Sequence, residues 1–380
     1  MKTEQKMWTK KRGWIPISDN NLKDSAQLVF VFGDSSFFKQ ERFFDEINEF
    51  YPKATIFGCS TAGEIAGAQV FDDSLVITAV LFEHTKLQFA KTKLDRMEES
   101  LKCGECLGEA FEKKGLTHVF ILSDGLNVNG SDLVKGLKGK IPSDVAVTGG
   151  LSGDQDRFQE TFVFSDNLPE KNTIIAVGFY GERLKIGYGS MGGWDSFGPD
   201  RLVTSSKGNI LYELDGKPAL DLYKKYLGEQ AKGLPATGLL FPLSLRLKDK
   251  DTGLVRTILS VNDKDKNMTF AGDVPEGAYV RLMKSNFNHL IDGACGAAKM
   301  SCESFGSDTP DLAILISCVG RKLLLKQRVE EETEGVQDIL GKSATLTGFY
   351  SYGEICPVVP TEKECELHNQ TMTITTFLER

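Results

Sequence analysis

The sequence has no long hydrophobic run and little cysteine for its length. Its longest apolar stretches, such as residues 75–82 and 312–316, are much shorter than the roughly 20 residues of a membrane-spanning helix. Residues 1–14 are polar and basic, so we expect no secretory signal there. Eight cysteines in 380 residues are too few for a disulfide scaffold. We therefore expect reduced thiols in a cytoplasmic protein.

The chain also lacks an excess of positive charge. It has 45 Lys and Arg residues against 53 Asp and Glu residues, a net charge of −8. Surfaces that follow nucleic-acid phosphates or anionic lipids need a cationic excess. We therefore expect neither nucleic acid nor a membrane as a partner. With 41% hydrophobic residues, the chain is long enough for two domains that each bury a core.

Three stretches share one pattern, in which an apolar run leads into a glycine turn that ends in an acid. Residues 56–65 contain Glu64, residues 345–355 contain Glu354, and the looser version at 145–154 ends at Asp154. An apolar run that stops at glycine is typical of a buried strand followed by a turn. The three copies indicate an internally duplicated unit.

The predicted elements follow the same order twice along the chain. Residues 27–180 and 277–378 both show strand, helix, strand, helix, strand, acidic turn and final strands. We therefore predict an α/β fold of two related domains, with mixed β-sheets flanked by helices. The predicted boundaries are an N-terminal tail at 1–26, a first domain at 27–186 and a second domain at 187–380.

The acidic turns are candidate binding sites for a small zwitterion. Successive N–H groups of a glycine turn, with the hydroxyls of Ser60 and Thr61, form a concave donor site for a carboxylate. Glu64 could then bind an ammonium group, and Glu354 and Asp154 offer the same acid in the related turns. The alternative is that each acid only binds the backbone amides of its own loop.

Three further residues are candidate ligand contacts. Arg321 follows a predicted parallel strand, where open α/β sheets bind ligands, and could hold a carboxylate. Its alternative role is a surface salt bridge with the acidic residues 330–334. Trp194 lies in the glycine-dense segment 187–199 and could pack across a domain boundary. Tyr350 neighbours the turn at Glu354.

Cysteine and histidine offer two other kinds of site. Cys59 could act as a nucleophile, but this needs a nearby base, and the sequence places no histidine beside it. The pairs Cys103-x-x-Cys106 and Cys365-x-x-His368 are isolated half-sites without the second pair that zinc needs. A haem needs one axial histidine, for which His368 is the best candidate. The alternative for His368 is a hydrogen-bonded histidine in the core.

Several motifs together resemble those of the FIST family. The motifs are Phe57-Gly-Cys-Ser-Thr-Ala-Gly-Glu64, Gly150-Leu-Ser-Gly-Asp154, Gly193-Trp194, Leu214-Asp-Gly-Lys-Pro-Ala219, Val255-Arg256, Cys318-Val-Gly-Arg321, Gly348-Phe-Tyr-Ser-Tyr-Gly-Glu-Ile355 and Leu367-His-Asn-Gln-Thr-Met372. The chain thus resembles a FIST N-terminal domain followed by a FIST C-domain. The resemblance implies an intracellular sensory protein of signal transduction that binds small molecules such as amino acids. Some family members are similar to haem-binding nitric oxide sensors that act on partner histidine kinases.

We therefore predict a non-enzymatic cytoplasmic sensor without a cofactor. It would bind an amino acid or similar small polar molecule between its two domains and signal to a separate protein such as a histidine kinase. The predicted ligand-binding residues are Cys59, Ser60, Thr61, Glu64, Asp154, Trp194, Arg321, Tyr350 and Glu354. Two alternatives stay open: a haem-based nitric oxide sensor with His368 as the iron ligand, and a hydrolase or transferase that uses Cys59.

Overall fold

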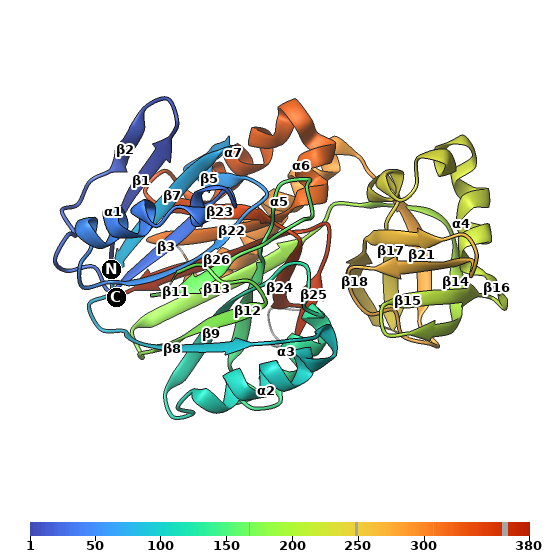
Figure 1. Cartoon of the computed structure of the whole chain (residues 1–380), viewed down its shortest axis with the longest axis horizontal. Helices are drawn as coiled ribbons and strands as arrows, with labels where there is room; N and C mark the ends of the chain where they lie inside the picture. The colour runs from blue at the N-terminus through green and yellow to red at the C-terminus, as the bar shows by residue number, and fades with distance from the viewer. Residues whose placement is uncertain (167, 248–249, 307, 359–363) are drawn as a thin grey trace.

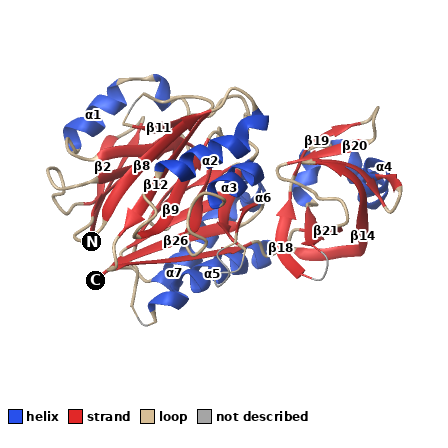
Figure 2. Ribbon diagram, turned by 90° about the horizontal axis from the view of Figure 1, so that it is seen from below, coloured by secondary structure: helices blue, strands red, loops and turns tan. Residues whose placement is uncertain are grey.

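A computed structural model describes residues 1–166, 168–247, 250–306, 308–358 and 364–380 (Figure 1). It shows an α/β body, made of residues 1–194 and 285–380, and a small β domain, made of residues 195–284. The α/β body is built on mixed sheets with helices on their outer faces (Figure 2). This confirms the predicted α/β class.

Three sheets form the α/β body within the described residues. The first has the order β11 (Val163–Ser165), β4 (Thr55–Ser60), β3 (Leu28–Gly33), β7 (Ser74–Leu81), β1 (Lys2–Thr9), β2 (Gly13–Ser18). The second has the order β25 (Cys365–His368), β24 (Gly353–Pro357), β10 (Ala146–Leu151), β9 (Leu116–Ser123), β12 (Thr173–Tyr180), β8 (Lys86–Lys93). The third has the order β13 (Leu184–Met191), β26 (Met372–Glu379), β22 (Leu312–Cys318), β23 (Thr345–Ser351), β5 (Glu64–Ala66), β6 (Gln69–Phe71).

Each sheet is built around the same three strands. A parallel pair, β3 with β4, β9 with β10 or β22 with β23, lies beside one antiparallel strand, β7, β12 or β26. An acidic glycine turn follows the second strand of every pair. The internal duplication predicted from these turns is therefore present, and it comprises three units, whose cores run from β1 to β7, from β8 to β12 and from β13 to β26.

The three units exchange strands in a closed ring. The hairpin β5–β6 of the first unit pairs with β23 of the third, through Gly348 and Ile65 among others. The hairpin β24–β25 of the third unit pairs with β10 of the second, and β11 of the second pairs with β4 of the first. Each sheet therefore ends in a strand from another unit, so the units are interlocked.

The main hydrophobic core joins all three units. Phe30 and Phe120 lie with their ring centroids 5.7 Å apart, and Phe32 and Phe349 with theirs 4.8 Å apart. A second layer of the core lies between the sheets and the helices, which are α2 (Ser100–Ala110), α3 (Gly130–Lys138), α5 (Phe287–Cys302) and α7 (Val329–Leu340). The helix α1 (Arg42–Phe50) covers the first sheet with Phe43, Phe44 and Ile47. Their spacing of three and four residues places these side chains on one face.

The small β domain is inserted in the third unit, between β13 and α5. Its strands are β14 (Asp195–Lys207), β15 (Ile210–Leu214), β16 (Lys217–Pro218), β17 (Leu243–Leu247), β18 (Lys250–Arg256), β19 (Ile258–Asn262), β20 (Asn267–Phe270) and β21 (Tyr279–Lys284), with one helix, α4 (Ala219–Leu227). Its core is a separate cluster of apolar side chains. The boundary predicted between residues 186 and 187 falls within β13 and stays a prediction.

In the described part of the chain, no helix has both the length and the apolar composition that crossing a membrane requires.

Candidate functional site

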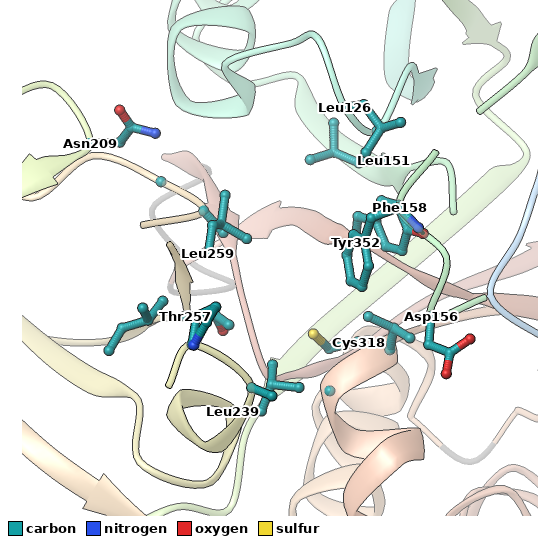
Figure 3. Close-up of a pocket in the computed structure, with 18 of the residues that line it drawn as sticks. Leu126, Leu151, Asp156, Phe158, Asn209, Leu239, Thr257, Leu259, Cys318 and Tyr352 are labelled. Atoms are coloured by element: carbon teal, nitrogen blue, oxygen red, sulfur yellow. Dashed lines mark hydrogen bonds between the residues drawn. The ribbon is translucent and has the colours of Figure 1, made fainter. Parts of the chain in front are cut away.

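A cavity of about 720 Å³ lies where the α/β body meets the small β domain (Figure 3). The second unit contributes the loops after β9 and β10, and the third unit contributes Tyr352 and the start of α6 (Val319–Leu325). The small β domain contributes Asn209 and three segments, at residues 233–239, 257–259 and 271–272. The cavity wall is thus shared between the two bodies.

Two stacked aromatic rings form one side of the cavity. The rings of Phe158 and Tyr352 lie 4.4 Å apart at 15°. The Tyr352 hydroxyl donates to the Gln155 carbonyl at 3.1 Å and accepts from the N–H groups of Asp154 and Phe158 at 3.0 and 3.3 Å. Phe158 has a φ of 51°, a conformation that costs energy for a residue other than glycine. The Tyr352 hydroxyl thus ties the loop of Phe158 to the segment that carries the partner ring.

Much of the remaining wall is apolar and accessible. Met97, Leu259 and Leu323 line the cavity together with Phe158, and all four side chains are more than a third exposed. They come from separate parts of the chain. Exposed apolar side chains that gather in one place mark an interaction site more often than scattered ones do.

The two asparagine side chains of the wall are bonded within the protein, whereas the buried hydroxyl of Thr257 is not. Asn129 accepts from the Ser131 N–H and donates to Asp273, and Asn209 donates to the Phe270 carbonyl. Thr257 is 5% exposed, and its hydroxyl has no hydrogen-bond partner. Cys318 directs its sulfur toward the cavity (Figure 3), and burial raises the pKa of this thiol. Thr257 Oγ1 is thus a buried polar group that a ligand can satisfy.

The three acidic turns meet one another beside this cavity. Gly153 donates its N–H to the Ser60 carbonyl at 2.9 Å, and Ala62 donates to the Tyr350 carbonyl at 2.8 Å. The hydroxyl of Tyr352, from the third turn, binds Asp154 in the second. The duplication therefore brings together turns that are far apart in the sequence.

Glu64 and Glu354 occupy equivalent positions, and each is bonded both to its own turn and to a residue at a later strand. Glu64 accepts from the hydroxyls of Thr61 and Ser74, and Glu354 accepts from those of Ser351 and Thr371. Burial raises the pKa of both carboxyl groups to about 8. Neither residue lines the cavity. Each acid thus bonds within the protein, to its own turn and to the residue that begins or precedes a later strand, and a ligand role for Glu64, Thr61 and Glu354 stays a prediction.

Ser60 and Asp154 connect the first two units. The Ser60 hydroxyl donates to the Gly153 carbonyl at 2.8 Å. Asp154 is buried, accepts from the Ser35 hydroxyl at 2.6 Å and forms an ion pair with Arg157 at 2.6 Å. Neither residue lines the cavity.

Arg321 and Tyr350 converge on one buried acid, Glu332. Arg321 forms an ion pair with Glu332 at 2.8 Å and donates to the carbonyls of Gly192 and Leu290. The Tyr350 hydroxyl donates to Glu332 at 2.7 Å. The acidic segment 330–334 does supply the partner of Arg321, but the pair is buried rather than on the surface.

Trp194 packs beside this group, against Leu290, whereas Cys59 lies in the hydrophobic core. Trp194 donates its indole N–H to the Gln370 carbonyl at 2.9 Å and lines a second cavity, of about 380 Å³, beside the small β domain. Cys59 is fully buried in the main hydrophobic core. Burial and the nearby Glu64 raise the pKa of the Cys59 thiol far above its ordinary value. The structure thus holds Cys59 as an unreactive core thiol.

The surroundings of His368 do not fit a haem ligand. The side chain is 4% exposed, and its Nε2 lies 3.0 Å from the Cys356 carbonyl oxygen. Burial lowers the pKa of His368 to about 4, so the neutral ring donates to this carbonyl. His368 lines neither described cavity. No group of three or more candidate metal ligands occurs among the described residues.

None of the nine predicted ligand-binding residues lines the cavity. Tyr352 lies within the motif that ends at Ile355, and Thr257 directly follows Val255-Arg256. Both residues therefore lie in or next to a motif that the sequence shows. Phe158 carried no signal, because a single apolar residue in a loop shows no periodicity, and the strand of Leu259 gave no sign that it borders a cavity.

Comparison with known proteins assigns almost the whole chain to one family. A model of the FIST N domain matches residues 27–217, and a model of the FIST C domain matches residues 219–357. The uncharacterized protein MJ1623 of Methanocaldococcus jannaschii is 23% identical over 365 residues, which cover 91% of this chain and 69% of that protein. A crystal structure of cyanuric acid hydrolase from A. caulinodans matches with 10% identity and a TM-score of 0.19, over 78% of this chain and 99% of that chain. A similarity this low carries no argument about fold or activity.

Proposed function

Because this chain belongs to the FIST family, whose domains are sensory modules of signal transduction, we propose that it senses a small molecule bound between its α/β body and its small β domain. The observation that carries this proposal is the cavity of about 720 Å³, whose wall is shared by the two bodies. Small-molecule sites are typically concave, largely apolar and of this size.

The two bodies contact each other through polar bonds next to the cavity and through apolar packing, in which Leu240 lies against Leu290, Leu324 and Leu325. Asn129 of the α/β body donates to Asp273 of the small β domain at 3.2 Å. Arg256 of the small β domain donates to the Leu367 carbonyl of the α/β body at 2.9 Å. A ligand that contacts both walls adds to these bonds and favours the closed arrangement of the two bodies. A separate protein would read this arrangement, and a histidine kinase remains the partner implied by the family resemblance.

The proposal includes a non-enzymatic role and the cytoplasmic location expected from the sequence. The burial of Cys59 supports the non-enzymatic role, because a buried thiol with a raised pKa is a poor nucleophile. The amino acid or similar small polar ligand expected from the sequence is one ligand class to be tested.

Thermal-shift screening of a small-molecule library that includes amino acids tests the proposal. A ligand should raise the melting temperature of the full chain, because it binds the folded state. Ala236 lines the cavity and is exposed, so Ala236→Trp should fill the cavity without disturbing a core. Ala110→Trp, at an exposed position on α2 away from the cavity, is the control. The shift should persist in Ala110→Trp and disappear in Ala236→Trp, and an equal shift in both would overturn the proposal.

A further inference from the structure

The cavity wall carries almost no charge. None of its lining side chains, all of which the structure describes, is Lys, Arg or His. Its acid, Asp156, is exposed, and Figure 3 shows the carboxylate at the edge of the site, turned away from the other labelled side chains. Arg256 lies directly behind Gly272 but donates to the carbonyls of Asp273 and Leu367. A ligand carboxylate or phosphate would therefore be buried without a cationic partner, which is unfavourable.

The wall also offers few polar groups that a ligand could bind. Thr257 Oγ1 is the lining side-chain oxygen that is both buried and without a partner in the described structure. It lies across the cavity from Phe158 and Tyr352 in Figure 3. A hydroxyl both donates and accepts, so it fits a ligand O–H, N–H or carbonyl group.

The aromatic side of the cavity favours a flat ring system. The outer ring of the stacked pair, Phe158, is 44% exposed, so a further ring can stack against it. Leu259 and Leu323 supply accessible aliphatic surface in the same cavity. Together they can remove a large part of an apolar ligand from water.

We propose that the ligand is an uncharged molecule with a flat apolar ring system and one polar group. Its rings pack against Phe158 and Tyr352, and its polar group binds Thr257 Oγ1. This assignment rests on the proposed function and names the ligand class of the same site. The second cavity differs in charge, because its wall carries Asp200, Arg246 and Arg281.

Two fluorescent probes with one ring skeleton test this assignment on the full chain. N-phenyl-1-naphthylamine is neutral and has one N–H group, whereas 1-anilinonaphthalene-8-sulfonate adds a negative charge. We expect the neutral probe to bind roughly tenfold more tightly, because the wall offers the sulfonate no cation. Indole should displace the neutral probe, and the zwitterion L-tryptophan should not.

Point variants test whether Thr257 and Phe158 contribute to binding of the neutral probe. Thr257→Val should weaken binding of the neutral probe about fivefold, the effect of one lost hydrogen bond. Thr257→Ser keeps the hydroxyl and should restore the affinity. Phe158→Ala should weaken binding roughly tenfold through lost ring contact. Thr269→Val, in the same domain but outside the cavity, is the control and should leave the affinity unchanged.

Three outcomes would overturn the assignment: tighter binding of the sulfonate probe, displacement of the neutral probe by L-tryptophan, or unchanged affinity in both Thr257→Val and Phe158→Ala. These outcomes differ from failure of the proposed function. If a charged compound binds and Ala236→Trp abolishes its binding, the site stands and only the ligand class is wrong. If no compound of any class binds in the cavity, the proposed function fails as well.

Discussion

At the scale of single residues, the acids that the sequence pattern singled out stabilise the turns in which they lie. Glu64 and Glu354 each accept from a hydroxyl three residues earlier, on Thr61 and Ser351, and from a hydroxyl at the next long strand of the unit. Donors on both sides let each carboxyl group stay buried with its oxygens bonded. The repeated spacing of a hydroxyl and an acid three residues later is therefore explained by the structure of the turn.

Burial of these two acids predicts a loss of stability as the pH rises. The pKa of each is raised from an ordinary value of 4.5 to about 8. Between these values the folded protein keeps a proton that the unfolded chain releases, so the free energy of unfolding falls with rising pH by at most about 1.4 kcal/mol per pH unit for each group. Urea unfolding from about pH 5 to about pH 8 should show this decrease, and the double variant E64Q/E354Q should reduce it.

The matched control for this effect is Glu98→Gln. Glu98 is exposed, so its loss should leave the pH dependence of unfolding as it is in the natural chain. Equal slopes for E64Q/E354Q and the natural chain would show that the two acids keep ordinary pKa values in the folded protein.

The cysteines should differ widely in reactivity. Cys106 is exposed on α2, whereas Cys59 and Cys356 are fully buried, and burial raises the pKa of both buried thiols. Ellman's reagent should therefore label Cys106 first in the native protein, and Cys59 only after unfolding in urea. Cys106→Ser should remove the fast phase. Fast labelling of Cys59 in that variant would revive the hypothesis of a Cys59 nucleophile.

At the scale of elements, one glycine in each unit lets two neighbouring strands approach closely. A Cβ atom at Gly58, Gly149 or Gly348 would lie within 2.1 Å of a carbonyl oxygen of the adjacent parallel strand. The three positions are equivalent, since each lies on the second strand of a parallel pair. The glycine in each turn motif is therefore required by backbone packing.

Substitution of Gly348 should be strongly destabilising. In Gly348→Ala the new Cβ would lie 1.8 Å from the Leu315 carbonyl oxygen, so the strands must separate. We expect a loss of more than about 3 kcal/mol in the free energy of unfolding, measured with urea. Gly139→Ala is the control: its nearest atom would lie 3.4 Å away and its φ of −65° suits alanine. A Gly348→Ala variant as stable as Gly139→Ala would contradict this account.

The sequence predicted the local parts of this fold better than their assembly. The buried strands and the three acidic turns follow from apolar runs that stop at glycine, and the structure contains them. The pairing of β5–β6 with β23 and of β24–β25 with β10 could not be predicted, because strand exchange leaves no periodicity in the sequence. The cavity was missed for the same reason, since its wall combines loops of two units with an inserted domain.

At the scale of the whole molecule, the chain has two bodies whose main cores are separate and which share a small apolar cluster of Leu240 with Leu290, Leu324 and Leu325. The main cores of the α/β body contain no residue from 195–284, and the core of the small β domain is built from residues 203–282. The chain enters and leaves the small β domain at neighbouring points, since Asp195 and Lys284 are paired in β14 and β21. This arrangement predicts that the α/β body can fold without the small β domain.

Removal of the small β domain should therefore leave the α/β body folded. Paired residues of an antiparallel ladder lie roughly 5 Å apart, so an Asn-Gly turn can join Asp195 directly to Lys284. The deletion loses the bonds Asn129–Asp273 and Arg256–Leu367 and the packing of Leu240, and we expect a modest fall in melting temperature by circular dichroism. Binding of N-phenyl-1-naphthylamine should be abolished, because Thr257 and Leu259 leave with the deleted domain. An unfolded deletion variant would show that the two bodies fold as one unit, and full retention of probe binding would show that the site does not lie between them.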